Sequence, residues 1–234
     1  MAAGRTVGGL QRGGDGVIVF DKWVLPDGEQ HLQEWMSKAN RRVDGRLTYQ
    51  YHKYEAARRF CTSRRVAIDV GAHCALWSFW MARDFAKLHA FEPKPDHVSC
   101  WTLNMEGVQN ADLAQVALGP KRGTVGLFTG ASSSGNTYVV EGGTGVEMRT
   151  LDSYAFENVD LIKIDCEGYE VFVLEGARDT LERCKPVVIV EQKPGHGQNF
   201  GRGERDAVKL LQSMGARQVW DYAGDYVLRF ERAS

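Results

Sequence analysis

Polar residues follow four apolar, strand-like runs of this 234-residue sequence. They lie in the segments 69–73, 91–93, 163–168 and 191–196. In an open parallel sheet, ligands bind at the carboxyl ends of the strands. We therefore expect a binding site at these four segments, whose carboxylates, lysine and histidines are groups that hold a ligand or move a proton.

The turn at 69–73 suits a cofactor that has no phosphate groups. Gly71 permits a tight turn and close approach of the backbone. A dinucleotide site has three glycines here, whereas this turn has one, and Asp69 adds negative charge where a diphosphate would lie. A cofactor with a positive centre, such as S-adenosylmethionine with its sulfonium, fits the turn better. The alternative is an ordinary turn between a strand and a helix.

Glu92 ends the second run about 20 residues after the glycine turn. At this spacing a carboxylate accepts the hydroxyl hydrogen bonds of a ribose. Pro93 ends the strand and fixes the turn. The alternative is a glutamate on a surface loop, and the spacing from the first turn favours the ribose contact.

Asp165 and Glu191 end the third and fourth runs, and side-chain alternation places Lys163 on the same side of its strand as Asp165. These carboxylates and His196 are predicted to converge on one pocket. Two converging carboxylates can provide a base and stabilise a sulfonium, or they can hold a divalent metal. We expect Asp165 to be the base, followed by Glu191 or His196, and we assign no metal. The alternatives are an ion-pair role for Lys163 and an exposed loop position for His196.

Alternating strands and helices must position these residues. Strands are predicted over 66–70, 87–92 and 115–118, with helices over 76–85 and 95–106 between them. This order predicts a parallel, right-handed α/β sheet whose first strand is buried on both faces. Ala117 and Leu118, at the end of the third strand, are expected to border an adenine.

The middle and the end of the chain add further elements. Short antiparallel strands are predicted over 125–129, 138–141 and 146–151, with a polar loop over 131–136. The α/β pattern resumes with strands over 160–165 and 187–191 and helices over 169–183 and 204–214. Two final strands, 218–222 and 226–231, are predicted to form a hairpin, which makes the sheet mixed.

The first 65 residues have a different texture. A strand is predicted over 17–20 and helices over 29–43 and 48–61, while the glycine-rich residues 1–16 are expected to be loosely attached. Residues 1–65 hold twelve Lys or Arg against seven Asp or Glu. Their arginines form either a solvated face or a basic rim for an anionic substrate, and we favour the solvated face.

Composition excludes several classes of protein. The net charge of −1 provides no global attraction to nucleic acid. No apolar run approaches the roughly 20 residues of a membrane span, and the N-terminus does not resemble a secretory signal. The five cysteines have no CxxC spacing, which favours reduced thiols in the cytoplasm over disulfides or a zinc site.

Five blocks of the sequence resemble the FkbM family of S-adenosylmethionine-dependent methyltransferases. They are DVGAHCALWSFWMA, FEPKPDH, RTLDSY, DLIKIDCEGYEVFVLEGA and KPVVIVEQ, and they run from about Val66 to Gln192. In the family pattern D-x-G-A-N-x-G, His73 stands for the Asn and Ala75 for the second Gly. The resemblance implies a Rossmann-like class I methyltransferase fold, with a mostly parallel seven-stranded sheet and a terminal antiparallel hairpin. It also implies O-methylation of a hydroxyl group, often on a sugar or a natural product.

We therefore predict a cytoplasmic S-adenosylmethionine-dependent O-methyltransferase with no membrane association. Its methyltransferase domain spans 66–234, and residues 1–65 form a mainly helical extension that could cover the substrate. Asp69, Gly71, Ala72 and His73 are expected to hold the amino-acid tail of the cofactor, and Glu92 its ribose. The acceptor is predicted to be a hydroxyl group of a small molecule or a glycan.

Three other functions compete with this prediction. An NAD-dependent oxidoreductase needs the glycine-rich turn that segment 69–75 lacks. A non-catalytic module could keep the fold and bind the cofactor only. A ribose 2′-O-methyltransferase acting on nucleic acid could stack bases on Trp23, Trp35, Tyr49 and Tyr51, although we expect these aromatic residues to lie in the core.

Overall fold

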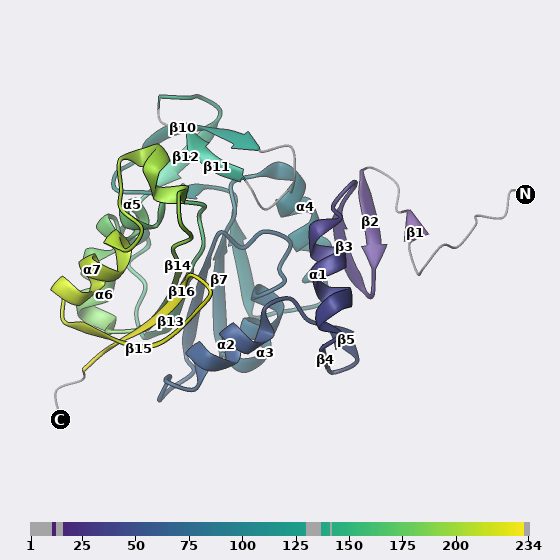
Figure 1. The fold of residues 1–234 in the computed structure, drawn as a ribbon, viewed down its shortest axis with the longest axis horizontal. Helices are drawn as coiled ribbons and strands as arrows, with labels where there is room; N and C mark the ends of the chain where they lie inside the picture. The colour runs from purple at the N-terminus through teal and green to yellow at the C-terminus, as the bar shows by residue number, and fades with distance from the viewer. Residues whose placement is uncertain (1–10, 13–15, 130–136, 141, 232–234) are drawn as a thin grey trace, which may run out of the picture.

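The computed structural model describes residues 11–12, 16–129, 137–140 and 142–231, and a seven-stranded sheet lies at its centre (Figure 1). The strand order is β15-β16-β14-β13-β6-β7-β8. The bounds are β6 (Val66–Val70), β7 (Lys87–Phe91), β8 (Ala111–Ala114), β13 (Val159–Ile164), β14 (Val187–Glu191), β15 (Ala216–Tyr222) and β16 (Asp225–Phe230). The neighbouring strands β8, β7, β6, β13 and β14 pair in parallel, and β16 runs antiparallel to both β14 and β15. The predicted mixed sheet with a terminal hairpin is confirmed.

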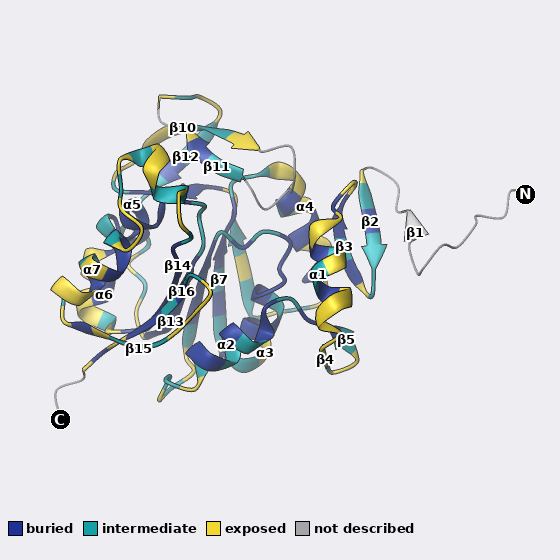
Figure 2. Cartoon of the chain, viewed as in Figure 1, coloured by how far each residue is buried: buried dark blue, intermediate teal, exposed yellow. Residues whose placement is uncertain are grey.

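Helices cover both faces of the sheet, because successive residues of a buried strand point to opposite sides. Ala67 and Leu161 pack on one side, with α2 (Tyr51–Arg58), α3 (Ser78–Asp84) and α4 (Pro95–Asn104). Ile68 and Ile162 pack on the other side, with α5 (Glu170–Glu175), α6 (Arg178–Cys184) and α7 (Asp206–Ser213). Figure 2 shows the buried central strands between partly exposed helices. Among the described residues, no helix combines the length and apolar character needed to cross a membrane.

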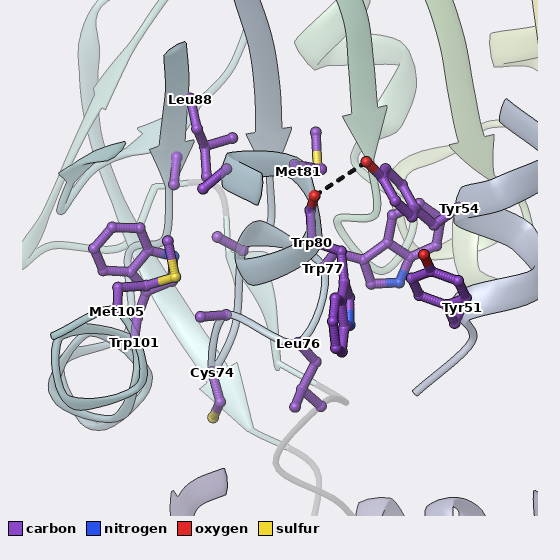
Figure 3. Packing of buried hydrophobic residues seen from close by; sticks show 14 of the residues in the cluster. Tyr51, Tyr54, Cys74, Leu76, Trp77, Trp80, Met81, Leu88, Trp101 and Met105 are labelled. Atoms are coloured by element: carbon purple, nitrogen blue, oxygen red, sulfur yellow. Dashed lines mark hydrogen bonds between the residues drawn. The ribbon is translucent and has the colours of Figure 1, made fainter. Parts of the chain in front are cut away.

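Aromatic side chains join the N-terminal region to the sheet domain (Figure 3). The hydroxyl of Tyr54 on α2 donates to the carbonyl oxygen of Trp80 on α3, at 3.1 Å. The rings of Tyr51 and Trp80 meet edge to face with centroids 5.2 Å apart, and Trp77 packs on Tyr54 at 5.9 Å. Residues before Val66 therefore share a hydrophobic core with the sheet.

The N-terminal region contains more strand than the sequence predicted. The predicted strand at Val17–Phe20 is confirmed as β2, and it forms a sheet with β1 (Gln11–Arg12) and β3 (Trp23–Pro26). The predicted helices are shorter than expected, because α1 spans His31–Ala39 and α2 begins at Tyr51. The hairpin β4 (Arg42–Val43) and β5 (Arg46–Leu47) separates them. Of residues 1–16, which were expected to be loosely attached, 1–10 and 13–15 lie outside the described part of the chain, whereas Gln11–Arg12 pair with β2.

The prediction of the third sheet strand over 115–118 is wrong. The strand next to β7 is β8, whereas β9 (Ala117–Leu118) pairs in parallel with β12 (Val146–Arg149). The second sheet has the order β11-β10-β12-β9, with β10 (Gly123–Thr129) and β11 (Thr137–Val140) antiparallel as expected. The buried, apolar Ala117 and Leu118 belong to the second sheet, whereas the edge strand β8 of the central sheet is partly exposed and less apolar. The loop predicted over 131–136 lies outside the described residues.

The single helix predicted over 169–183 is two helices, α5 and α6, which separate at Gly176. A Cβ atom on Gly176 would lie 2.0 Å from the carbonyl oxygen of Gly119, so the backbones are in close contact there. Asp152, in the 3₁₀ helix η1 (Leu151–Tyr154), accepts hydrogen bonds from the backbone N–H groups of Asp179 and Thr180. This carboxylate caps the start of α6, which explains why the helix restarts.

Candidate active site

A cavity lies at the carboxyl ends of β6, β7 and β13, and the small sheet contributes one of its walls. Many of its polar residues lie at the ends of those strands or in the loops after them, and its apolar residues include the segment 116–118 and side chains of β10 and β11. The lining includes Tyr49, Gly71, Ala72, His73, Glu92, His97, Val116, Ala117, Leu118, Leu127, Val139, Lys163, Asp165, Glu167 and Lys193. The cavity therefore occupies the place where a doubly wound sheet binds its ligand.

The turn after β6 is held by close backbone contacts. The N–H groups of Gly71 and Ala72 both donate to the carbonyl oxygen of Phe91, at 3.0 and 3.1 Å. Gly71 has a φ of +74°, and a Cβ atom on it would lie 1.9 Å from the carbonyl oxygen of Asp165. Only glycine satisfies both requirements, which confirms the tight turn that the sequence predicted at this position.

Glu92 is a buried carboxylate at the end of β7 that organises the rim of the cavity. It accepts hydrogen bonds from the backbone N–H groups of His73, at 2.9 Å, and Lys94, at 3.0 Å. The Nδ1 atom of His97 on α4 lies 3.2 Å from the same carboxylate. The Nε2 atom of His97 is buried beside the cavity and has no hydrogen-bond partner among the described residues. A ligand with hydroxyl groups could use this nitrogen together with Glu92.

Lys163 links the strand β13 to the turn after β6. Its Nζ donates to the carbonyl oxygen of Gly71 at 2.7 Å and lies 3.3 Å from Asp69 and 3.8 Å from Asp165. Burial alone would lower the pKa of Lys163, but these two carboxylates raise it above its usual value. The other oxygen of Asp69 accepts a hydrogen bond from the hydroxyl of Ser78 at 2.6 Å. Lys163 is therefore a charged clamp that fixes the turn.

Carboxylates gather where β13 and β14 end. Asp165, Glu167 and Glu191 each place one oxygen within 4.8 Å of the others. Burial and the charge of Asp165 raise the pKa of Glu191 well above its usual value, and they raise the pKa of Glu167 to about 8. Burial opposes ionisation of Asp165, but Lys163 and Lys193 hold its pKa below the ordinary value. Asp165 is thus the carboxylate of the three that is ionised most readily.

Two further groups lie beside these carboxylates. His196, in the 3₁₀ helix η2 (His196–Phe200), has its Nδ1 atom 2.9 Å from Glu167, and burial lowers the pKa of its ring. Tyr49 lines the cavity, and burial and Asp165 raise the pKa of its hydroxyl. A neutral imidazole and a neutral phenol can accept or donate hydrogen bonds to an acceptor molecule.

Most of the predicted site residues line the cavity; these are Gly71, Ala72, His73, Glu92, Ala117, Leu118, Lys163 and Asp165. Asp69 lies behind the turn, where its partners are Ser78 and Lys163. Glu191 and His196 lie beside the lining residues and contact Lys193 and Glu167 respectively. Ala117 and Leu118 reach the cavity from the small sheet, which corrects the expectation that they end a strand of the central sheet.

Four further residues line the cavity that were not predicted from the sequence as site residues: His97, Tyr49, Lys193 and Glu167. Glu167 and Lys193 belong to segments that were singled out, and they lie two residues after Asp165 and Glu191. His97 lies five residues after Glu92 and one turn into a helix, a spacing that returns its side chain to the strand end. Tyr49 precedes α2 and carried no signal in the sequence that would connect it to the sheet.

A comparison with known protein families matches most of the chain to one domain family. Residues 69–218 match the methyltransferase FkbM domain family. No curated protein sequence gives a significant match. A methyltransferase FkbM structure from Methylobacillus flagellatus KT is 16% identical with a TM-score of 0.45, and the alignment covers 72% of this chain and 44% of that chain.

For two other similar structures, the alignment with this chain covers most of their length. An rRNA methylase from Streptococcus thermophilus is 13% identical with a TM-score of 0.47, and the alignment covers 78% of this chain and 95% of that chain. N-methyltransferase NodS from Bradyrhizobium japonicum WM9 is 9% identical with a TM-score of 0.48, and 78% and 97% of the two chains are covered. The family match spans well over half of the sequence and includes the turn after β6, Glu92 and Asp165, so the chain belongs to the FkbM family of S-adenosylmethionine-dependent methyltransferases.

Proposed function

We propose that the protein transfers a methyl group from S-adenosylmethionine to a hydroxyl group of a small molecule, a sugar or a natural product. One observation carries the proposal: a single cavity joins the Gly71 turn and Glu92 to the ionised carboxylate of Asp165. A cofactor site and a proton acceptor are the two components that methylation of a hydroxyl requires.

The lining of the cavity fits this cofactor. The carboxylate of Glu92 would accept a hydrogen bond from the ribose hydroxyls, and the unpartnered Nε2 atom of His97 would make a second hydrogen bond to them. Val116, Ala117 and Leu118 offer apolar surface to the adenine. The turn at Gly71, Ala72 and His73 would hold the amino-acid tail. The ionised carboxylate of Asp165 favours a positive charge such as the sulfonium.

The cofactor supplies a methyl group that is already activated for transfer. The protein therefore has to align the acceptor and remove its proton. Asp165 is the proposed base because it lines the cavity and stays ionised beside Lys163 and Lys193. Glu191 and His196 are the next candidates, since both lie next to this group of carboxylates.

The structure offers little support for a nucleic-acid acceptor. Trp23 and Tyr51 are buried in the core, while Trp35 and Tyr49 are partly exposed. Four arginines of the N-terminal region are occupied in ion pairs: Arg41 with Glu55, Arg42 with Asp21, Arg58 with Asp84 and Arg65 with Asp160. Arginines that are neutralised in this way are poorly suited to bind phosphate groups. The proposed location is the cytoplasm, in keeping with five free cysteine thiols.

The proposal is tested by calorimetry and by methyl-transfer assays. The protein should bind S-adenosylhomocysteine, and mass spectrometry should detect a mass gain of one methyl group on a member of a panel of hydroxylated acceptors. Asp165→Asn should lower the rate by about 10²–10⁴-fold and leave the affinity for S-adenosylhomocysteine nearly unchanged. Turnover close to that of the parent would remove Asp165 from the base position, and absence of S-adenosylhomocysteine binding would overturn the proposed function.

A further inference from the structure

The three carboxylates at the ends of β13 and β14 have the spacing of a metal-ligand set. Asp165, Glu167 and Glu191 each offer one oxygen, and these oxygens all lie within 4.8 Å of one another. Oxygens that bind the same Mg²⁺ ion at about 2.1 Å can be at most about 4.2 Å apart, and about 4.8 Å for a longer bond of about 2.4 Å. The three oxygens lie within the upper limit of this range.

Glu191 provides a second, independent observation. Its side chain is only 3% exposed. One oxygen, Oε2, lies 2.8 Å from the Nζ of Lys193, whereas the other, Oε1, is buried and accepts no hydrogen bond from an N–H or O–H group of the described residues; the side chain also lies against the carboxylate of Asp165. A buried carboxylate oxygen without a partner is costly, so a proton or a cation is expected next to it.

The local charge balance also leaves room for a cation. Lys163 lies between Asp69 and Asp165, and Lys193 pairs with Glu191. Lys53 pairs with Asp225, which lies opposite Glu191 in the sheet. When Glu167 is included, five carboxylates face three ammonium groups, and two negative charges have no counter-charge when all groups are ionised. A divalent cation would supply this charge.

We infer that Asp165, Glu167 and Glu191 form a binding site for a divalent cation, Mg²⁺ or Mn²⁺, at the acceptor end of the cavity. The ligand set consists of oxygens alone, which suits these hard cations rather than zinc or copper. From the sequence alone, Asp165 and Glu191 could provide a base or hold a divalent metal, and no metal was assigned; the structure places Glu167 beside them.

Such a site would contribute to acceptor binding, because Asp165 and Glu167 line the cavity. A cation held there would attract a hydroxyl oxygen of the acceptor and ease the loss of its proton. This role rests on the proposed function, whereas binding of the ion does not.

The test is a titration of chelator-treated protein with MnCl₂, in which electron paramagnetic resonance measures free Mn²⁺. We expect one Mn²⁺ site per chain, and the substitutions Asp165→Asn and Glu167→Gln should each weaken it at least about tenfold. The matched control is Asp112→Asn, because Asp112 is exposed and lies on the edge strand β8; this variant should bind Mn²⁺ like the parent. Circular dichroism on heating establishes that each variant is folded.

Two results would overturn the inference. One is a parent protein that binds no Mn²⁺ at this stoichiometry. The other is a folded Asp165→Asn or Glu167→Gln variant with the affinity of the parent. Either result would mean that protons balance the excess negative charge. Calorimetry of the metal-free protein with S-adenosylhomocysteine separates this outcome from failure of the proposed function, because cofactor binding through Glu92 and the Gly71 turn does not involve the ion.

Discussion

Replacement of Lys163 by methionine tests how the turn after β6 is held in place. The substitution keeps the length of the side chain but removes the ammonium group, which donates to the carbonyl oxygen of Gly71 and lies 3.3 Å from Asp69. Asp69 has no exposed surface. Its carboxylate would then keep the hydroxyl of Ser78 as a partner but would lose its positive neighbour.

The expected cost follows from this burial. Breaking a buried ion pair by removing one partner costs about 3–5 kcal/mol, because the remaining charge is left without compensation. In a domain of this size, each kcal/mol lowers the melting temperature by about 2–4 °C. Lys163→Met should therefore lower the melting temperature by roughly 6–20 °C. Differential scanning calorimetry or urea unfolding measures this change.

A double substitution separates the cost of the unpaired charge from the loss of packing. In Asp69→Asn combined with Lys163→Met, the buried charge is gone, and the amide of the new side chain can still accept the hydrogen bond from Ser78. We expect the double variant to be more stable than Lys163→Met alone. The reasoning is refuted if Lys163→Met costs less than about 1 kcal/mol, or if the double variant is no more stable than this single variant.

Three further substitutions test other parts of the site. Glu92→Ala should raise the dissociation constant for S-adenosylhomocysteine at least tenfold, because a hydrogen bond to a charged group contributes about 1.5–3 kcal/mol; unchanged affinity would contradict the ribose contact. Gly71→Ala should abolish this binding, because its Cβ would collide with the carbonyl oxygen of Asp165, whereas Gly107→Ala, at a similar φ of +81° but with open space around it, should retain it. Burial raises the pKa of Glu170 to about 7. Protonation of Glu170 stabilises the folded parent below the unfolded pKa of about 4.3, and this stability is lost as the pH rises to 7. In urea unfolding, the free energy of unfolding of Glu170→Gln should therefore rise relative to that of the parent by up to about 3 kcal/mol over this range. A difference that does not change with pH would contradict the pKa shift.

Much of the central sheet could be predicted from the sequence because its buried strands are mostly apolar. The segments 66–70 and 187–191 were placed correctly, because each is an apolar run whose one carboxylate lies at or near its end. The edge strand β8 lacks this signal, since its sequence ADLA is partly exposed, and the neighbouring apolar run was assigned in its place. Short hairpins such as β4–β5 depend on tertiary contacts and could not be inferred from periodicity.

The sequence predicted only those residues of the site that lie at or next to the end of a strand. Glu92, Asp165 and Glu191 end or directly follow strands, so the topology alone brings them to one edge of the sheet. Tyr49 reaches the same cavity through packing between the N-terminal region and the sheet, which no local pattern encodes. The pairing of His97 with Glu92 depends on the angle at which α4 leaves its loop, which the sequence also does not specify.

The two departures from the family pattern in the first block lie at positions with a positive φ. The positions of Asn and the second Gly in that pattern are occupied by His73 and Ala75, and both have positive φ values, +48° and +69°. A residue with a Cβ atom in this region costs about 1–2 kcal/mol. Hydrogen bonds offset this cost: the N–H of His73 donates to Glu92, the N–H of Ala75 donates to the carbonyl oxygen of Ala72, and Asn104 donates to the carbonyl oxygen of Cys74. Because Glu92 both supports this turn and lines the cavity, the conformation of the turn and the binding of the cofactor depend on the same carboxylate.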